Sequence, residues 1–175
     1  MSDEFFKEID NLEVSDAERL ELKKGILAVK KMHKQKAKEM LKRHEGLRLY
    51  VYECTGGKKT IGYGRNLEDR GITEAEAEAM LDSDIEYTEE RLVSSYEFYK
   101  DLDETRKAVL IDIAFNIGMT GLKGFKKMLI ALEEGDYSEA AIQLLDSRYA
   151  KQVPNRAMEL ARLLDGAQGS DNRNE

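Results

Sequence analysis

The sequence of 175 residues contains a single proline, Pro154, so little in it opposes the formation of long helices. Glu, Lys, Ala and Leu, which all favour helices, are abundant. Because Trp is absent and aromatic residues make up 7% of the chain, Leu, Ile, Val and Met must fill the core. We therefore predict a mainly α fold.

Capping boxes predict where two helices begin. In each box, a hydroxyl side chain and a glutamate three residues later satisfy free backbone N–H groups of the first helical turn. Ser15 with Glu18 predicts one start, and Thr73 with Glu76 predicts a long helix through about Val93. Shorter helices are expected over residues 103–117, 124–134, 138–146 and 156–164.

A short stretch interrupts the helical pattern with β-sheet character. Residues 47–53 alternate in side-chain type and are rich in β-branched and aromatic residues, which is typical of a strand. The Gly-Gly pair at 56–57 predicts a tight turn into a second strand over residues 59–63. This region is expected to form a β-hairpin.

Glycines mark the ends and bends of these elements. The helix before the hairpin is expected to end at Glu45 and Gly46, because glycine is favoured just past a helix C-terminus. Gly62 and Gly64 suit a close approach of the backbone to another group, or a sharp bend in a short strand.

Charge and cysteine content restrict the possible partners. The chain carries 28 basic and 35 acidic residues, a net charge of −7, which argues against nucleic acid as the main partner. Cys54 is the only cysteine, so no internal disulfide can form, and His33 and His44 are too few for a metal cluster. We expect a monomer without a cofactor or a metal.

Residues 23–43 carry a concentrated positive charge. Nine basic residues stand against Glu39 alone, and apolar residues recur among them at roughly helical spacing, which predicts a basic amphipathic helix. A solvated helix face is the favoured interpretation, because most charge runs are of this kind. The alternative is a docking element for an anionic surface, such as phospholipid headgroups, lipopolysaccharide or wall polymer. The basic residues are Lys23, Lys24, Lys30, Lys31, Lys34, Lys36, Lys38, Lys42 and Arg43.

No targeting or membrane-spanning segment is predicted. The longest apolar run near the N-terminus, residues 25–29, is flanked by lysines and is far shorter than a signal-sequence core or a membrane span. We expect a protein made in the cytoplasm, for which a substrate beyond a membrane would require a separate export route.

Three residues around the hairpin are the strongest candidates for catalysis. Glu45 is followed after eight intervening residues by Cys54, and after five more by Thr60. Cleavage of a glycosidic bond needs an acid to protonate the leaving oxygen, and a positioned water or a nucleophile to attack the sugar. Glu45 can supply the proton, Thr60 can hold the water, and the Cys54 thiol can orient the water or attack.

Each of these residues is ordinary when taken alone. A glutamate at a helix end is usually solvated, a single cysteine is usually a small buried apolar residue, and threonine is common in strands. The combination and its spacing carry the prediction. Apolar residues that follow Glu45 are expected to remove water from its carboxyl group, as a general acid requires; they are Leu47, Leu49 and Val51.

Residues 37–164 resemble glycoside hydrolase family 24, the phage-type lysozymes or muramidases. Three blocks in order carry the resemblance. The first is HEGLRLYVY followed by Cys54 and by TIGYG from Thr60. The second is AFNIGMTGLKGF, residues 114–125, and the third is SRYAKQVPNRA, residues 147–157.

The resemblance implies roles for single residues. Glu45 matches the family's general acid, Cys54 occupies a position where members carry Asp or Cys, and Thr60 matches the threonine near the attacking water. Phe115 and Asn116 match a segment that lines the sugar-binding cleft. These five positions are the predicted catalytic and substrate-binding residues.

Two further positions leave alternatives open. Arg156 falls on an arginine that approaches the catalytic glutamate, but a cation there would favour the charged carboxylate, so we expect Arg156 chiefly to lock the two lobes together. Cys54 stands in place of a second carboxylate, and the sequence does not decide between a thiol that positions water and a thiolate that forms a covalent intermediate. Glu53 cannot substitute, because neighbouring residues of a strand point to opposite faces.

The implied fold is mainly α, of the α+β lysozyme type, with a small N-lobe of helix and β-hairpin, a long connecting helix and an all-helical C-lobe. We expect residues 1–35 to form an N-terminal helical extension and residues 36–165 to form the lysozyme catalytic domain. Within this domain the N-lobe spans 36–72, the connecting helix 73–95 and the C-lobe 96–165. Residues 166–175 are poor in apolar side chains and are expected to be disordered.

The implied function is hydrolysis of the β-1,4 bond between N-acetylmuramic acid and N-acetylglucosamine in bacterial peptidoglycan. The leading interpretation is an endolysin made in the host cytoplasm, which acts on periplasmic peptidoglycan in phage-mediated lysis. The alternatives are a virion-associated lysozyme that opens the wall, a lytic transglycosylase, and a non-catalytic wall-binding module of the same fold.

Overall fold

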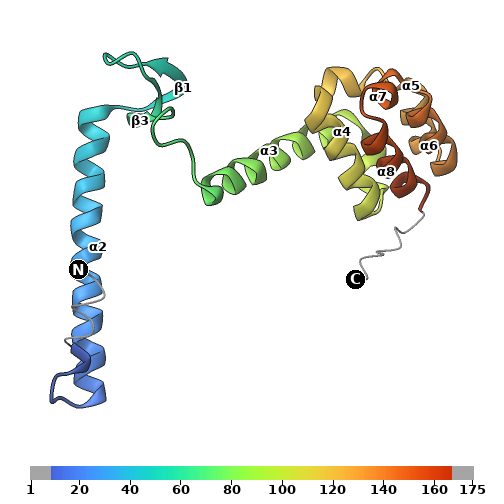
Figure 1. Ribbon diagram of the computed structural model, residues 1–175. Helices are drawn as coiled ribbons and strands as arrows, with labels where there is room; N and C mark the ends of the chain where they lie inside the picture. Colours follow the sequence, from blue (N-terminus) through green and yellow to red (C-terminus); the bar gives the residue numbers. More distant parts are fainter. Residues whose placement is uncertain (1–8, 167–175) are drawn as a thin grey trace. The chain divides into compact units, whose positions relative to one another are not determined.

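The computed structural model describes residues 9–166 (Figure 1). The chain forms two compact units, Met1–Ile72 and Thr73–Glu175, each with its own architecture. Helices dominate, and a small antiparallel sheet accompanies them, which confirms the predicted mainly α fold. The tail predicted to be disordered lies, except for Gly166, outside the described residues.

One long helix, α2 (Asp16–Glu45), makes up nearly half of the described N-terminal unit. It begins at the predicted capping box, where the Ser15 hydroxyl accepts from the Glu18 N–H and the Glu18 carboxylate accepts from the Ser15 N–H. It ends as predicted, because Gly46 takes φ 68° and ψ 164°. Since α2 is unbroken at residues 35 and 36, the proposed boundary of the N-terminal extension falls inside one helix.

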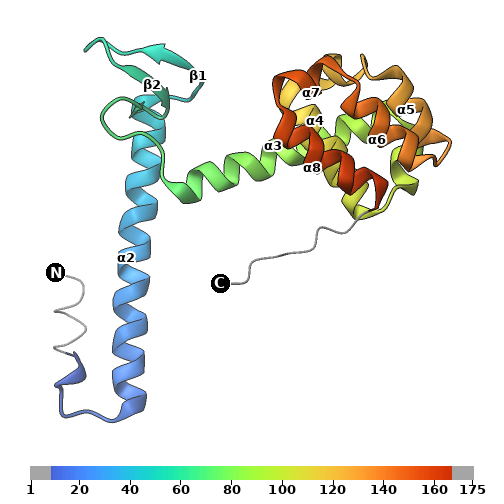
Figure 2. The same cartoon turned by 45° about the vertical axis from the view of Figure 1, so that its right-hand side comes forward.

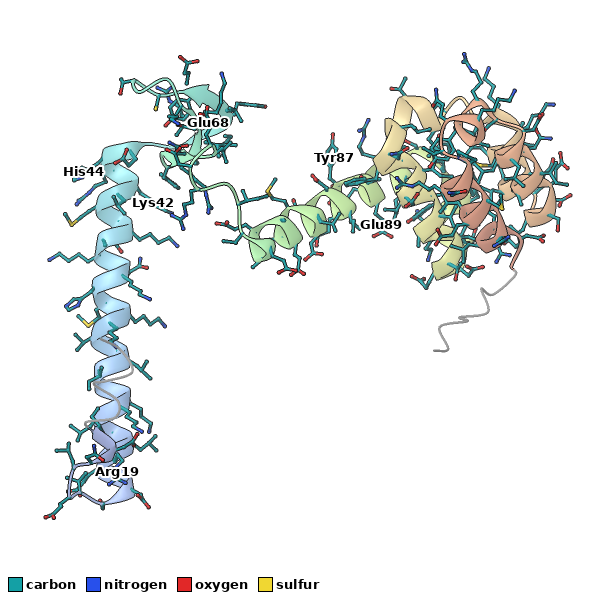
Figure 3. The ribbon with its side chains drawn as sticks, in the orientation of Figure 1. Arg19, Lys42, His44, Glu68, Tyr87 and Glu89 are labelled. Carbon is teal, nitrogen blue, oxygen red and sulfur yellow. The ribbon has the colours of Figure 1, made fainter. Side chains whose placement is uncertain are left out.

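The residues before α2 fold back against its first turns. Ile9 is buried, and Arg19 donates to the carbonyl oxygens of Ile9 and Leu12 at 3.3 and 3.0 Å. Lys23 Nζ lies 2.6 Å from Asp10 Oδ1. Beyond this region every residue from 31 to 45 is exposed, and Figure 3 shows the side chains of α2 projecting on all sides.

A three-stranded antiparallel sheet follows α2, in the order β1–β2–β3. The strands are β1 (Arg48–Glu53), β2 (Lys59–Gly62) and β3 (Arg65–Asn66). Tyr52 pairs with Thr60 and Glu53 with Lys59, so the predicted hairpin is confirmed.

The third strand is absent from the sequence prediction because two residues are too few to show a pattern. It forms because Gly62 and Gly64, with φ of 69° and 81°, turn the chain back on β2. In this register Ile61 pairs with Arg65 and Thr60 with Asn66. The predicted bend at the two glycines is therefore confirmed.

The C-terminal unit begins with the helix α3 (Glu74–Ser95), which starts at the predicted capping box of Thr73 and Glu76. A 3₁₀ helix and five α-helices follow and pack around one core (Figure 2). They are η1 (Glu97–Asp101), α4 (Glu104–Leu122), α5 (Lys126–Glu133), α6 (Tyr137–Leu145), α7 (Arg148–Gln152) and α8 (Pro154–Asp165). Neither η1 nor α7 is predicted from the sequence, because five residues are too few to show helical periodicity.

Aliphatic side chains, two methionines and two tyrosines, Tyr99 and Tyr149, fill this core, which contains no Trp. Leu92, Leu110, Ile113 and Leu144 are fully buried, and Tyr99 is buried with its hydroxyl donating to Glu89 at 3.2 Å. Burial raises the pKa of Tyr99, and the charge of Glu89 adds to the effect. This contact joins η1 to α3.

Burial along α3 increases toward its end. Leu92 is buried and Ile85 is half-buried, but Leu81 and Ala77 are exposed. Within the C-terminal unit, α3 packs against η1 and α4, which cover its last turns. The core of this unit therefore includes only the second half of α3.

Helix α4 bends where the sequence predicted its end. Gly118 takes φ 71° and ψ 164°, which interrupts the helix before it resumes to Leu122. No single helix within residues 9–166 has the length and apolar character to cross a membrane. The bent pair of α4 and α5, which meet at 113°, satisfies that criterion by length and composition only.

Candidate active site

Glu45 is the last residue of α2, and its carboxylate lies against the turn between β2 and β3. A Cβ atom added to Gly64 would lie 3.3 Å from Glu45 Oε2 and 3.8 Å from its Cδ. The bare backbone of Gly64 therefore leaves the space that the carboxylate occupies. The sequence analysis had singled out Gly64 for a close approach, but had not identified Glu45 as the group that approaches.

The predicted shielding of Glu45 from water is wrong within the N-terminal unit. Glu45 is exposed, and Leu47, Leu49 and Val51 are 54%, 73% and 54% exposed. The physical reason is that nothing in this unit packs on these side chains of β1, since Ile9 and Thr60 are the buried residues among its described part.

Cys54 begins the loop between β1 and β2. Its N–H donates to the Lys58 carbonyl oxygen at 3.0 Å, and its own carbonyl oxygen accepts from the Gly57 N–H at 2.9 Å. The thiol lies within hydrogen-bonding reach of the N–H groups of Lys58 and Gly56 and of the Thr60 hydroxyl. These donors favour the thiolate and so lower the pKa of Cys54 below its ordinary value, and the Lys58 N–H has the largest effect.

Thr60 is buried on β2, with 2% of its surface exposed. Because Tyr52 pairs with Thr60, the Thr60 side chain lies diagonally across from Cys54 on one face of the hairpin. Its hydroxyl donates to the Lys58 carbonyl oxygen at 3.0 Å. A hydroxyl has a single proton, so Thr60 donates either to this carbonyl oxygen or to a Cys54 thiolate.

Glu53 lies on the other face of the strand, as the alternation of side chains predicts. Its Oε2 is 3.5 Å from Lys59 Nζ, directly across the two strands. The Glu53 carboxylate thus pairs with Lys59 on the face opposite Cys54. Glu53 therefore cannot take the place of the second carboxylate beside the sulfur.

The loop that positions the thiol is itself held by acidic residues that sequence reasoning missed. Lys58 Nζ lies 3.1 Å from Asp69 Oδ1 and 3.5 Å from Glu68 Oε2, and Glu68 Oε1 accepts from the Lys59 N–H at 3.0 Å. Figure 3 shows Glu68 beside the sheet. Asn66 fixes the acidic turn, because its Oδ1 accepts from the N–H groups of Glu68 and Asp69.

The other predicted site residues belong to the C-terminal unit. Phe115 and Asn116 are exposed on α4, one turn beyond Asp112. Arg156 on α8 donates to both carboxylate oxygens of Asp112, from Nε and from one terminal nitrogen, at 2.8 Å each. The lock that Arg156 forms here joins α8 to α4. Its predicted roles toward Glu45 and between the lobes stay predictions.

A hollow of about 810 Å³ opens beside α5, α6 and α7 in the same unit. Phe125 and Tyr149, whose rings meet edge to face, contribute apolar surface, and Lys126, Lys127 and Arg148 contribute positive charge. Its described lining includes Ile117 but neither Phe115 nor Asn116. Among residues 9–166, no group of three or more His, Cys, Asp or Glu side chains could hold a metal ion.

Comparison with known proteins identifies the family of the chain. The phage lysozyme family matches residues 42–162, a range that contains all six predicted site residues. A probable T4-type lysozyme of Dictyostelium discoideum is 30% identical, with 69% of this chain and 88% of that protein covered. An endolysin of Acyrthosiphon pisum secondary endosymbiont phage 1 is 35% identical, with 67% of this chain and 80% of that protein covered.

A third relative is named for a different role. The pre-baseplate central spike protein of Enterobacteria phage T4 is 27% identical over 72% of this chain, which corresponds to 27% of that larger protein. The matched range, the hairpin with its acid, thiol and hydroxyl, and the helical C-terminal unit lead to one conclusion. The chain belongs to the phage lysozyme family and is a lysozyme-type cell-wall hydrolase.

Proposed function

We propose that this protein hydrolyses the β-1,4 bond between N-acetylmuramic acid and N-acetylglucosamine in bacterial peptidoglycan, with Glu45 as the general acid. The observation that carries the proposal is the placement of Glu45 against Gly64 in the unit that also pairs the Cys54 thiol with Thr60. Membership of the phage lysozyme family supports the choice of bond. Phe115 and Asn116 are the proposed substrate-binding residues, and Arg156 supports the site.

In the proposed reaction, protonated Glu45 donates its proton to the glycosidic oxygen as the bond to the sugar carbon breaks. A water held by the Thr60 hydroxyl attacks that carbon, and the Cys54 thiolate accepts the proton that the water loses. Solvent then returns one proton from the thiol to the Glu45 carboxylate. One water is consumed for each bond cleaved.

We assign Cys54 to the water rather than to the sugar because it lies on the same face of the hairpin as Thr60, the residue that holds the water in the proposed reaction. The N–H groups of Lys58 and Gly56 favour the thiolate, which provides a proton acceptor beside that water. Attack by this water forms no covalent bond between the sugar and the protein. The proposed reaction therefore inverts the configuration of the sugar.

The Glu45→Gln variant tests the acid. Loss of general acid catalysis is expected to slow the clearing of purified peptidoglycan sacculi by about a thousandfold. Glu53→Gln is the matched control, because Glu53 lies on the opposite face of β1 beside Lys59 and its neutralisation leaves the proposed site intact. Full activity of Glu45→Gln would refute Glu45 as the acid. A parent protein that binds sacculi without clearing them would favour a wall-binding module.

Analysis of the first product tests the role of the thiol. Inversion gives the α-anomer from a β-linked substrate, which nuclear magnetic resonance detects before mutarotation. A β-anomer would instead indicate a covalent thiol intermediate. A product lighter than the hydrolysis product by one water would indicate a lytic transglycosylase.

We further propose that the protein acts as an endolysin, made in the host cytoplasm and acting on periplasmic peptidoglycan during phage-mediated lysis. Similarity to a phage endolysin supports this role. Similarity to the central spike protein favours a virion-associated lysozyme as the second candidate. Mass spectrometry of purified virions separates the two, because an endolysin is absent from the particle. Residues 36–165 are the proposed catalytic domain, with residues 1–35 as an extension.

A further inference from the structure

Helix α2 carries a continuous stripe of lysines on one face. Leu27, Lys31, Lys34, Lys38 and Leu41 follow one another at intervals of four and three residues, which aligns them along one side of a helix. We call these five residues the lysine stripe.

The charges of the lysine stripe are not neutralised within the described part of the chain. Lys31, Lys34 and Lys38 are exposed and form no ion pair with any of residues 9–166. Closer to the start of α2, Lys23 pairs with Asp10 and Lys24 with Glu21, at 2.6 and 2.8 Å. The three stripe lysines span about 10 Å of helix and form a dense positive surface.

Two exposed leucines flank this charged surface, one at each end. Leu27 and Leu41 are each 54% exposed, one on either side of the three lysines along the helix. A water-soluble polyanion would neutralise the lysines and leave both leucines hydrated. A phospholipid interface can accommodate both kinds of side chain, because headgroups pair with lysines while the apolar boundary below them takes up leucine.

The catalytic fold does not account for the lysine stripe. The family match begins at residue 42, so the whole stripe precedes it. The net charge of −7 does not prevent binding to an anionic surface, because salt screens charges beyond about 10 Å and the local charge of α2 therefore governs contact.

We propose that the lysine stripe docks α2 on an anionic phospholipid surface. Lys31, Lys34 and Lys38 pair with headgroup phosphates, while Leu27 and Leu41 enter the boundary between headgroups and acyl chains. This docking is independent of which bond in the cell wall the protein cleaves.

Partitioning of the full chain into vesicles tests the charge component. The probe is a vesicle of phosphatidylcholine with about one-third phosphatidylglycerol, compared with pure phosphatidylcholine. The triple variant Lys31→Gln/Lys34→Gln/Lys38→Gln should lower the partition coefficient on the anionic vesicles about a hundredfold, because each lysine near such a surface contributes roughly a fivefold factor. Gln retains helix propensity close to that of Lys, and circular dichroism checks that α2 persists.

The matched control is Lys100→Gln/Lys123→Gln/Lys151→Gln, which removes three exposed lysines of the C-terminal unit and changes the net charge equally. Its partition coefficient should stay within about twofold of the parent value. An equal loss in both triple variants, or no binding by the parent at low salt, overturns the proposal. Clearing of sacculi without membranes should be unchanged in the stripe variant; a lower rate would assign the stripe to catalysis instead.

Tryptophan fluorescence tests the immersion of the leucines, because the chain has no Trp of its own. In Leu27→Trp, binding to anionic vesicles should shift the emission to the blue as the indole leaves water. Met32→Trp is the matched control, since Met32 is 70% exposed and lies five residues on, about 140° around the helix. Binding to nucleic acid or sacculi without a blue shift on vesicles would contradict lipid docking. So would a dimer of the parent that the triple stripe variant cannot form.

Discussion

The carboxylate of Glu45 lies on the bare backbone of Gly64, where a Cβ atom would come within 3.3 Å of Oε2. Gly64 also has φ of 81°, a conformation that side chains disfavour. The absence of a side chain at Gly64 thus permits both the turn into β3 and the close approach of the proposed general acid. A change at this glycine should affect catalysis as well as stability.

Gly64→Ala should lower activity on sacculi about a hundredfold, because a displacement of a catalytic group by about an ångström has an effect of this size. The unfavourable backbone conformation should also lower the free energy of unfolding by about 1–2 kcal/mol. Gly135→Ala is the control, since Gly135 has φ of 76° and no atom within 4 Å of an added Cβ. Equal activities of the two variants would show that the Gly64 contact does not position Glu45.

Cys54→Ser should lower turnover much more than Cys54→Asp. A serine hydroxyl stays protonated at neutral pH and cannot accept the proton of the attacking water, so turnover should fall at least about a hundredfold. An aspartate restores a charged acceptor beside the N–H groups of Lys58 and Gly56, so turnover should remain within about tenfold of the parent. A fully active serine variant would exclude the thiolate as the base.

Thr60→Val should separate the role of the hydroxyl from that of packing. Valine fills the same buried volume but cannot donate to Cys54 or to the Lys58 carbonyl oxygen, so both turnover and stability should decrease. Thr60→Ser keeps the donor and should retain most of the turnover. If Thr60→Val kept full turnover and Thr60→Ser lost it, the methyl group rather than the hydroxyl would be responsible.

The lowered pKa of Cys54 predicts a pH-dependent contribution to stability. Because the folded state favours the thiolate, the contribution is fully present above the ordinary thiol pKa and is lost as the pH falls through the lowered folded value. As the pH increases from the folded to the unfolded pKa of Cys54, the melting temperature of the parent should therefore rise relative to that of Cys54→Ala. A constant difference across that range would contradict the hydrogen-bonded thiolate.

Alkylation by iodoacetamide gives a direct check, because the chain contains no other cysteine. The rate follows the fraction of thiolate, so its midpoint should lie at lower pH than in the unfolded chain. In Thr60→Val the midpoint should move toward the unfolded value, since one of the donors to the sulfur is removed.

The pair of Asp112 and Arg156 should stabilise the C-terminal unit by a measurable amount. Both side chains are about one-third exposed, so a coupling energy of about 1 kcal/mol is expected from a double-mutant cycle of Asp112→Asn and Arg156→Lys. The pair of Glu104 and Lys107 is the control, because Glu104 is almost fully exposed and the coupling should stay below about 0.5 kcal/mol. Equal coupling in the two pairs would contradict a structural role for the bidentate contact.

Features that depend on neighbouring residues could be predicted from the sequence. The capping box of Ser15 and Glu18 fixes the start of α2 through contacts three residues apart, and Gly46 fixes its end. The glycine pair at 56–57 predicted the hairpin turn, and strand alternation predicted that Glu53 points away from the face of Cys54. The structure adds that Glu53 pairs with Lys59 on that other face.

Features that depend on tertiary pairing could not be predicted in this way. Asp112 and Arg156 are 44 residues apart, and nothing in the local pattern of either helix indicates its partner. The anchoring of Lys58 by Asp69 likewise depends on how the short β3 returns along the hairpin. The exposure of Leu49 differs from the prediction because alternation indicates which side chains share a face but not whether anything covers that face.

Because α2 is unbroken, it fixes the distance between a docked lipid surface and the proposed general acid Glu45. Glu45 continues the spacing of the lysine stripe, four residues after Leu41, and lies eleven residues from Lys34 on the same side of one rigid helix. At 1.5 Å per residue, the anchoring charge and the acid are held about 16 Å apart along the axis. A docked helix would therefore fix both the distance of the Glu45 carboxylate from the lipid-bound lysines and the side of the helix on which it lies.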